Sequence, residues 1–198
     1  MTYINQLETL CQQCGCKMET EVSLAEHTTF RVGGPCRALV HVNSARTAQT
    51  LVQFLRREEI PFVVLGRGSN VIVPDEGFDG VVLLFGHAFA RITRQKNQLV
   101  CQGGASLRAV CTAALDAGLT GLEFAYGIPG TVGGGLYMNA GAYGGELSHV
   151  AVSAEYLDRN GNLLQMDAAD MQLSYRHSCF MENGGIITSV TLQLQPGD

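Results

Sequence analysis

The sequence predicts an α+β fold built from two subdomains. Three observations support this prediction: helical spacing of apolar residues in three segments, short apolar strands between them, and a change of composition near residue 95. Before that point one strand–helix–strand unit is apparent, and after it β-rich patterns prevail. We therefore expect a first subdomain with an N-terminal helix over residues 1–95 and a second over residues 96–198.

The first subdomain contains two predicted helices. Residues 4–13 carry apolar side chains at helical spacing, and a second helix is predicted over residues 44–59, where Ser44 is a suitable N-cap. Short apolar runs predict the strands, at residues 38–42, 61–66 and 80–85.

The second subdomain contains one helix and two hairpins. Residues 106–119 are opened by Ser106 and closed by Gly118, as expected for a helix that ends in a left-handed residue. Hairpins are predicted around Lys96-Asn97 and around Asn160-Gly161, because such pairs favour tight turns. Residues 186–195 alternate and predict the last strand.

Composition excludes several classes of function. The chain has 198 residues, is 46% hydrophobic and 16% charged, and has a formal net charge of −5. Without a basic patch, nucleic acids and anionic membranes are not expected partners. The longest apolar runs are strand-sized, and the first ten residues show no secretory signal, so we expect a cytoplasmic protein.

The seven cysteines are an odd number and are interpreted as reduced thiols rather than a disulfide framework. CQQCGC at residues 11–16 has spacing that zinc sites also use. A zinc site would need a further ligand, and His27 is the nearest candidate, so we predict no metal and treat zinc as the lesser alternative.

Two glycine-rich stretches are candidate ligand sites. LGRGSNVIV at residues 65–73 follows a predicted strand, and it could turn backbone N–H groups toward an anion such as pyrophosphate. It lacks the third glycine and the following helix of a Rossmann fingerprint, and residues 71–73 look β-like. A tight strand-to-strand turn explains it equally well.

The second stretch, residues 127–145, holds eight of the 24 glycines. We interpret GIPGTVGG as a sharply turning loop that can lie against a flat or phosphorylated ligand. Tyr137, Asn139 and Tyr143 would supply the polar and aromatic contacts of a pocket. The alternative is a buried bend where elements pack closely.

These stretches, together with RVGGP at 31–35 and SYRHSCF at 174–180, resemble the UDP-N-acetylenolpyruvoylglucosamine reductases of bacterial cell-wall (peptidoglycan) synthesis. The resemblance covers the chain from about residue 24 onward. It implies noncovalent FAD held between two subdomains of the vanillyl-alcohol-oxidase (PCMH) type. It also implies NADPH as reductant and a UDP-sugar substrate, whose enolpyruvyl double bond is reduced to give UDP-N-acetylmuramate.

The resemblance also implies individual roles. The FAD pyrophosphate would be held by Gly66, Arg67, Gly68, Ser69, Asn70 and Val71. The flavin side would be lined by Gly127, Ile128, Pro129, Gly130, Thr131, Val132, Gly133, Gly134, Ala140, Gly141 and Ala142. Arg176 would be the catalytic arginine and Tyr175 would contact substrate. His27 is interpreted as structural, His177 as a loop residue rather than a general base, and Ser178 is assigned no catalytic role.

One departure affects the expected activity. Members of this family continue for roughly another hundred residues, which form the substrate-binding domain and carry a proton-donating serine and an assisting glutamate. We therefore expect these 198 residues to bind FAD and to be inactive alone. A stand-alone FAD module served by a third domain in trans is the alternative, and a different flavoprotein of the same fold is disfavoured by YRHS and by the lack of a histidine in GRGSN.

Overall fold

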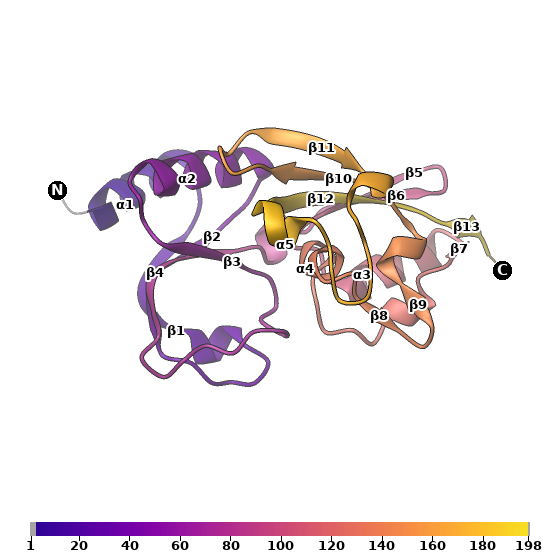
Figure 1. Ribbon diagram of the computed structural model, residues 1–198, viewed down its shortest axis with the longest axis horizontal. Coiled ribbons are helices and arrows are strands. Elements are labelled where there is room, and N and C mark those ends of the chain that lie inside the picture. The colour runs from indigo at the N-terminus through magenta and orange to yellow at the C-terminus, as the bar shows by residue number, and fades with distance from the viewer. Residues whose placement is uncertain (1–2, 198) are drawn as a thin grey trace. The chain divides into compact units, whose positions relative to one another are not determined.

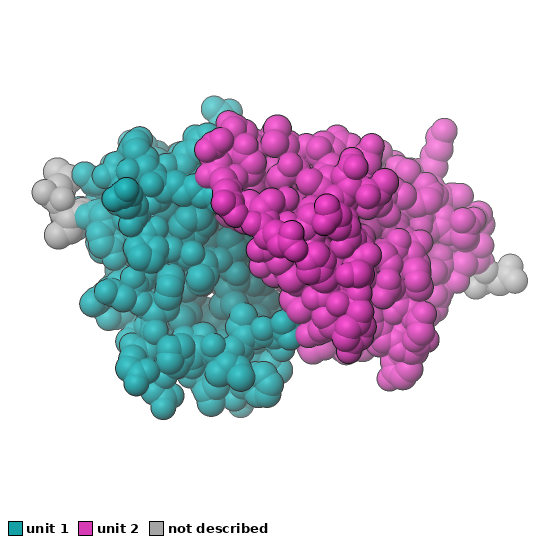
Figure 2. All heavy atoms as spheres, viewed as in Figure 1, with its two compact units in different colours: residues 1–88 teal, residues 89–198 magenta. Residues whose placement is uncertain are grey.

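The computed structural model describes residues 3–197 and divides into two compact units. The first unit ends at Ala88 and the second begins at Phe89, as the two colours in Figure 2 show. The predicted boundary between residues 95 and 96 falls instead in the turn between β5 (Ile92–Gln95) and β6 (Gln98–Gln102). These strands pair antiparallel with each other, so both belong to the second unit.

The first unit is a four-stranded sheet with two helices (Figure 1). Its elements are α1 (Tyr3–Cys14), β1 (Met18–Ser23), the 3-10 turn η1 (Leu24–His27), β2 (Pro35–His41), α2 (Ala45–Arg57), β3 (Phe62–Leu65) and β4 (Phe78–Leu84). The strand order is β1-β2-β4-β3. Both β2 and β3 run parallel to β4, so β4 separates the two strands of the predicted strand–helix–strand unit.

The predicted helices and strands of the first unit are confirmed. The Ser44 side chain accepts a hydrogen bond from the Thr47 N–H and caps α2, whose apolar face is fully buried at Leu51, Val52 and Leu55. Burying each such side chain contributes about 1.5–3 kcal/mol. Strand β1 was not predicted, because this edge strand has no fully buried residue and therefore a weak apolar pattern.

The second unit is a five-stranded sheet with strand order β11-β10-β12-β6-β5. Its helices are α3 (Leu107–Asp116), α4 (Val132–Tyr137) and α5 (Phe180–Asn183), and its other strands are β7 (Leu119–Thr120), β8 (Gly141–Ala142), β9 (Gly145–Glu146), β10 (Ala151–Leu157), β11 (Leu163–Asp167), β12 (Ile186–Gln193) and β13 (Gln195–Pro196). Helices α3 and α4 pack against β6 and against each other, and α4 also packs against β12.

The elements predicted for the second unit are also confirmed. Ser106 caps α3 through the Ala109 N–H, and Gly118 follows the helix with a φ of 64°. Strands β10 and β11 form the hairpin predicted at Asn160-Gly161. Among residues 3–197, no helix has the length and apolar character needed to cross a membrane.

Candidate functional site

The first glycine loop, residues 66–71, follows β3 and rests on the chain that leaves η1. Gly68 has a φ of 61°, and its carbonyl accepts a hydrogen bond from the Thr29 N–H at 3.0 Å. A Cβ on Gly68 would lie 2.1 Å from the His27 carbonyl oxygen, so only glycine fits. His27 thus takes part through its main chain, in keeping with the structural role predicted for it.

Residues 28–34 and 73–77 are packed at backbone distance beside this loop. The Gly34 N–H donates to the Pro74 carbonyl at 2.9 Å, and a Cβ on Gly34 would lie 2.1 Å from the Asp75 carbonyl oxygen. A Cβ on Gly33 would lie 2.6 Å from the Val73 Cβ. The glycines of RVGGP therefore hold two loops together. Residues 71–73, which looked β-like in sequence, form no strand, and Val73 packs against Gly33 instead.

The side chains of the 66–71 loop suit an anion. Arg67 and Asn70 are exposed and Ser69 is half-buried. The left-handed backbone at Gly68 is typical of turns in which successive N–H groups point to one side. The loop can thus present a guanidinium, a hydroxyl, an amide and main-chain donors to a phosphate.

The second glycine stretch begins with a sharp turn, as predicted. The Gly130 N–H donates to the Ile128 carbonyl at 2.9 Å across Pro129, the pattern of a γ-turn. The loop interpretation fails after this turn, because Thr131 caps α4 and accepts a hydrogen bond from the Gly134 N–H. Three glycines in a row weaken helical propensity, which is why the sequence did not indicate this helix.

The glycines of this stretch have two different functions. Gly133 lies against the Gly103 backbone, where a Cβ would be 3.0 Å from the carbonyl oxygen, and Gly135 lies against Leu147 and Leu107. These glycines let α4 pack closely, as in the alternative interpretation of a buried bend. In contrast, a Cβ on Gly127 would meet nothing within 4 Å, and Gly127 is exposed.

The N–H groups at the start of α4 are already engaged. The Val132 N–H donates to the Ala105 carbonyl at 2.7 Å, and the Gly133 N–H donates to the Gly103 carbonyl at 3.0 Å. The Gly130 N–H is also engaged, with the Ile128 carbonyl, so none of these three N–H groups is available to donate a hydrogen bond to a ligand. A ligand would instead meet the exposed surface of Gly127, Pro129, Gly134 and Gly141.

Tyr175 and Arg176 form the tip of a tight turn. Ser174 and His177 exchange backbone hydrogen bonds of 3.2 and 3.1 Å on either side of them. Arg176 has a φ of 56°, and Tyr175 is 89% exposed. Both residues at the tip of the turn are exposed.

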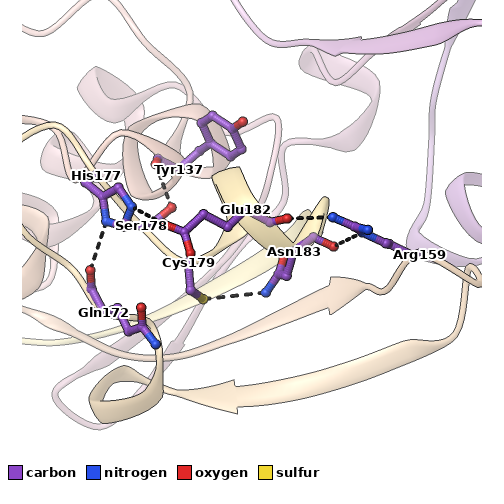
Figure 3. Close-up of polar contacts among 8 residues, drawn as sticks. All are labelled: Tyr137, Arg159, Gln172, His177, Ser178, Cys179, Glu182 and Asn183. Carbon is purple, nitrogen blue, oxygen red and sulfur yellow. Dashed lines mark hydrogen bonds and ion pairs between the residues drawn. The ribbon is translucent and has the colours of Figure 1, made fainter.

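Two side-chain hydrogen bonds tie this turn to the second glycine stretch. The Asn139 amide donates to the Ser174 carbonyl at 3.0 Å. The Ser178 hydroxyl donates to the Tyr137 carbonyl at 2.7 Å, as Figure 3 shows. Residues 35 and 41 positions apart in sequence are thereby joined within the second unit. Ser178 is fully buried, and its hydroxyl is engaged in this contact.

The far side of the turn is held by polar contacts with α5. The His177 ring lies 3.1 Å from a Glu182 carboxylate oxygen through Nε2 and 3.3 Å from the Gln172 carbonyl through Nδ1 (Figure 3). Arg159 donates to the carbonyls of Glu182 and Asn183. His177 thus orients the segment next to Arg176, as expected for a structural residue.

Asn139 differs from its expected role as a ligand contact. It is 2% exposed, and its Oδ1 accepts a hydrogen bond from the Ser148 N–H at 2.9 Å. Hydrogen bonds from the Ser148 hydroxyl and the Asn139 amide lower the pKa of Glu146. Asn139 therefore holds the turn, α4 and the β8–β9 hairpin together, whereas Tyr137 and Tyr143 are exposed.

Replacing Asn139 with alanine is expected to destabilise the fold by about 2–3 kcal/mol, because it removes two part-buried hydrogen bonds to the main chain and places alanine at a left-handed φ of 42°. Urea unfolding followed by circular dichroism measures the change. Asn162→Ala, at an exposed asparagine of the β10–β11 turn, is the control and should cost about 1 kcal/mol or less. Equal losses in the two variants would contradict the bridging role of Asn139.

The chain is similar to known flavoproteins in sequence. Residues 36–167 match the family described as an FAD binding domain, so both glycine stretches lie inside the match. A UDP-N-acetylenolpyruvoylglucosamine reductase of Clostridium novyi is 39% identical over 182 residues, which cover 92% of this chain and 59% of the relative. The chain belongs to this reductase family.

Solved structures agree with the assignment to the reductase family. The crystal structure of UDP-N-acetylenolpyruvylglucosamine reductase from Thermus caldophilus has a TM-score of 0.77 and 34% identity, and the match covers 92% of this chain and 64% of that one. A 4-ethylphenol oxidase from Gulosibacter chungangensis has a TM-score of 0.62 at 19% identity, covering 82% of this chain and 35% of that one. The second likeness concerns the fold alone and confirms the predicted α+β fold of the vanillyl-alcohol-oxidase type.

The chain spans about three-fifths of the length of the curated reductases that it matches. The roles predicted for Tyr175 and Arg176 depend on a segment beyond the matched residues 36–167. The sequence did not reveal that Asn139 and Ser178 hold that segment, since single polar residues carry no periodic signal. Among residues 3–197, no cluster of three or more His, Cys, Asp or Glu side chains is arranged to hold a metal ion, so the zinc alternative gains no support.

Proposed function

We propose that this chain binds FAD noncovalently as part of an NADPH-dependent reductase. The reductase would convert the enolpyruvyl ether of UDP-N-acetylglucosamine into UDP-N-acetylmuramate for peptidoglycan, in the cytoplasm, where NADPH is available. The observation that carries the proposal is the attachment of the Arg176 turn to the glycine stretch through Asn139 and Ser178. This attachment supports the proposal because it ties the segment that carries a permanent cation, Arg176, to the stretch whose exposed backbone a flat cofactor could approach.

The pyrophosphate of FAD would be held by residues 66–71 of the first unit. The left-handed backbone at Gly68 and the exposed Arg67 and Asn70 support this assignment, because they combine main-chain donors with a positive charge. Close packing against His27 and Thr29 holds the loop in this shape before any ligand binds. A preorganised loop loses less conformational entropy when it binds its ligand.

The flavin side of the cofactor would rest on the exposed part of residues 127–134 and on residues 140–142. The lack of any atom within 4 Å of a Cβ at Gly127 is consistent with room for a ligand there. Gly130, Val132 and Gly133 would contribute shape rather than hydrogen bonds, since their N–H groups are engaged. Gly134 and Gly141 are exposed and would provide backbone surface without side chains.

Bound FAD would supply the two-electron hydride chemistry. The chain's own contribution is electrostatic and geometric. Addition of hydride to a double bond conjugated with a carboxylate increases negative charge on the carboxylate oxygens. A guanidinium directed at those oxygens stabilises the transition state more than the ground state, and Arg176 would have this role. Tyr175, next to it on the exposed turn, would contact the UDP-sugar substrate.

The visible absorption spectrum tests FAD binding directly. The purified 198-residue chain is mixed with FAD, passed through gel filtration and scanned, and we expect a retained stoichiometric flavin band. Gly127→Val is expected to weaken FAD binding about tenfold or more, equivalent to at least about 1.4 kcal/mol, because the valine side chain would occupy the open space proposed for the flavin. It should not disturb the fold, since nothing lies within 4 Å of the Cβ position.

The control for this experiment is Ala169→Val, at an exposed position of the second unit outside both glycine stretches. It should bind FAD as the parent chain does, and both variants should unfold at the parental urea concentration. If no flavin is retained at saturating FAD, or if Gly127→Val binds FAD normally, the proposed cofactor site is incorrect.

A further inference from the structure

The CQQCGC segment forms a Schellman motif at the end of α1. The Cys16 N–H donates to the Cys11 carbonyl at 3.0 Å, and the Gly15 N–H donates to the Gln12 carbonyl at 3.1 Å. Gly15 has the left-handed φ of 63° that this motif requires. The motif also brings the side chain two residues past the helix end into contact with one in the last turn. Here both of these side chains are thiols, those of Cys16 and Cys11.

The two thiols differ in exposure. The Cys16 Sγ lies 3.5 Å from the Cys11 carbonyl oxygen, which shows that it folds back over the helix end. Cys11 is 1% exposed, whereas Cys16 is half-buried and can be reached from solvent. The pair therefore combines an accessible sulfur with a protected neighbour.

The end of α1 is held by Asn43, which immediately precedes the N-cap of α2. The Asn43 amide donates to the carbonyls of Cys14 and Gly15 at 3.2 and 3.0 Å. Asn43 is itself oriented by a 2.7 Å hydrogen bond from the Thr47 hydroxyl, next to the Ser44 cap. The positions of the thiols are thus set by two helix ends rather than by a mobile loop.

The hydrogen bond between the two thiols makes their acidities unequal. The Cys11 thiol, as donor, lowers the pKa of Cys16, while the same contact and burial raise the pKa of Cys11. Burial also raises the pKa of Cys14, and it raises those of Cys101 and Cys111 to about 12 and about 11. Since the thiolate is the reactive form, oxidation should begin at Cys16.

We propose that Cys11 and Cys16 form a reversible intramolecular disulfide when the protein meets a peroxide. In the first step the Cys16 sulfur attacks a peroxide oxygen, the O–O bond breaks, and hydroxide leaves and is protonated to water, which gives a sulfenic acid on Cys16. In the second step the Cys11 sulfur attacks that sulfur, the S–S bond forms, the S–O bond breaks and a second water leaves. Two thiols are oxidised and one hydrogen peroxide is reduced to two waters.

Mass spectrometry of one peptide tests the proposal. The purified chain is treated with a small excess of hydrogen peroxide, its remaining thiols are alkylated, and it is digested with trypsin. The peptide that ends at Lys17 contains Cys11, Cys14 and Cys16. We expect a product in which Cys14 alone is alkylated and the peptide has lost two hydrogen atoms. Dithiothreitol before alkylation should restore three alkylated cysteines.

Two variants distinguish this pairing from its alternatives. Cys14→Ser should still form the disulfide, whereas Cys16→Ser should lose it. Both positions are only partly buried, so both variants should fold, and unfolding in urea verifies this. A disulfide that persists in Cys16→Ser, or a parent peptide that remains fully alkylated after peroxide treatment, would overturn the proposal. FAD binding is measured separately on the reduced chain, so neither outcome depends on the proposed reductase function.

Discussion

Replacing Arg176 with alanine is expected to lower kcat/KM for reduction of the UDP-sugar about 10²–10³-fold, the usual cost of losing one group that stabilises developing negative charge. FAD binding should remain, because the cofactor contacts proposed above come from other residues. The kcat/KM of Arg176→Lys should fall between those of the parent and of Arg176→Ala, since an ammonium keeps the charge but lacks the planar guanidinium that binds a carboxylate through two hydrogen bonds. The measurement is NADPH oxidation in a protein with the full length of the curated relatives, with the flavin band recorded in parallel.

The left-handed backbone at Arg176 requires a second neutral variant. A φ of 56° is unfavourable for alanine, whereas asparagine tolerates it. Arg176→Asn therefore removes the charge with little change in the turn, and it should lose as much kcat/KM as the alanine variant. Arg94→Ala, at an exposed arginine of the β5–β6 hairpin, is the control for loss of a positive charge. Turnover by Arg176→Asn at the parental rate would exclude the proposed role of Arg176.

Replacing Gly68 with alanine is expected to destabilise the chain by about 3 kcal/mol or more. The left-handed conformation itself costs about 1–2 kcal/mol for a residue with a Cβ. In addition, the Cβ would lie 2.1 Å from the His27 carbonyl oxygen and 2.8 Å from the Thr28 Cα, so the backbone must move. We expect loss of the flavin band as well, since the loop that would hold the pyrophosphate changes shape. Urea unfolding and the absorption spectrum measure both effects.

Gly15→Ala is the matched control for this substitution. Gly15 lies in the same unit and has a φ of 63°, close to that of Gly68, but nothing lies within 4 Å of its Cβ position. Its loss should be limited to the conformational cost of about 1–2 kcal/mol. If the two variants lose the same stability, close backbone packing is not the reason for glycine at position 68.

Elements with strong local signals could be predicted from sequence. Helix α2 combines an N-cap at Ser44 with apolar residues on one face, and the β10–β11 hairpin has Asn160-Gly161 at its turn. Both signals come from neighbouring residues, so no knowledge of the fold is needed to detect them. Strand β1 and helix α4 were missed because their stability comes from packing against other segments rather than from their own composition.

The candidate site likewise has features that could be predicted from sequence and features that could not. The order and spacing of the glycine stretches and of SYRHSCF were sufficient to recognise the family from sequence. The separate functions of the glycines could not be predicted from sequence, because glycine occurs both where the space is open, as at Gly127, and where backbones are in close contact, as at Gly133. Which neighbour a missing side chain would meet depends on residues far away in the chain, here Gly103.

The sequence by itself determined the α+β class, most helices and strands, the reductase family and the residues proposed to hold FAD. Only the tertiary structure decided the place of β4 between β2 and β3, the attachment of the Arg176 turn through Asn139 and Ser178, and the contact of the Cys11 and Cys16 segments at a helix end. The reason is physical. Helical and strand periodicity reflect interactions over a few residues, whereas buried hydrogen bonds and backbone contacts form between segments that only the complete fold brings together.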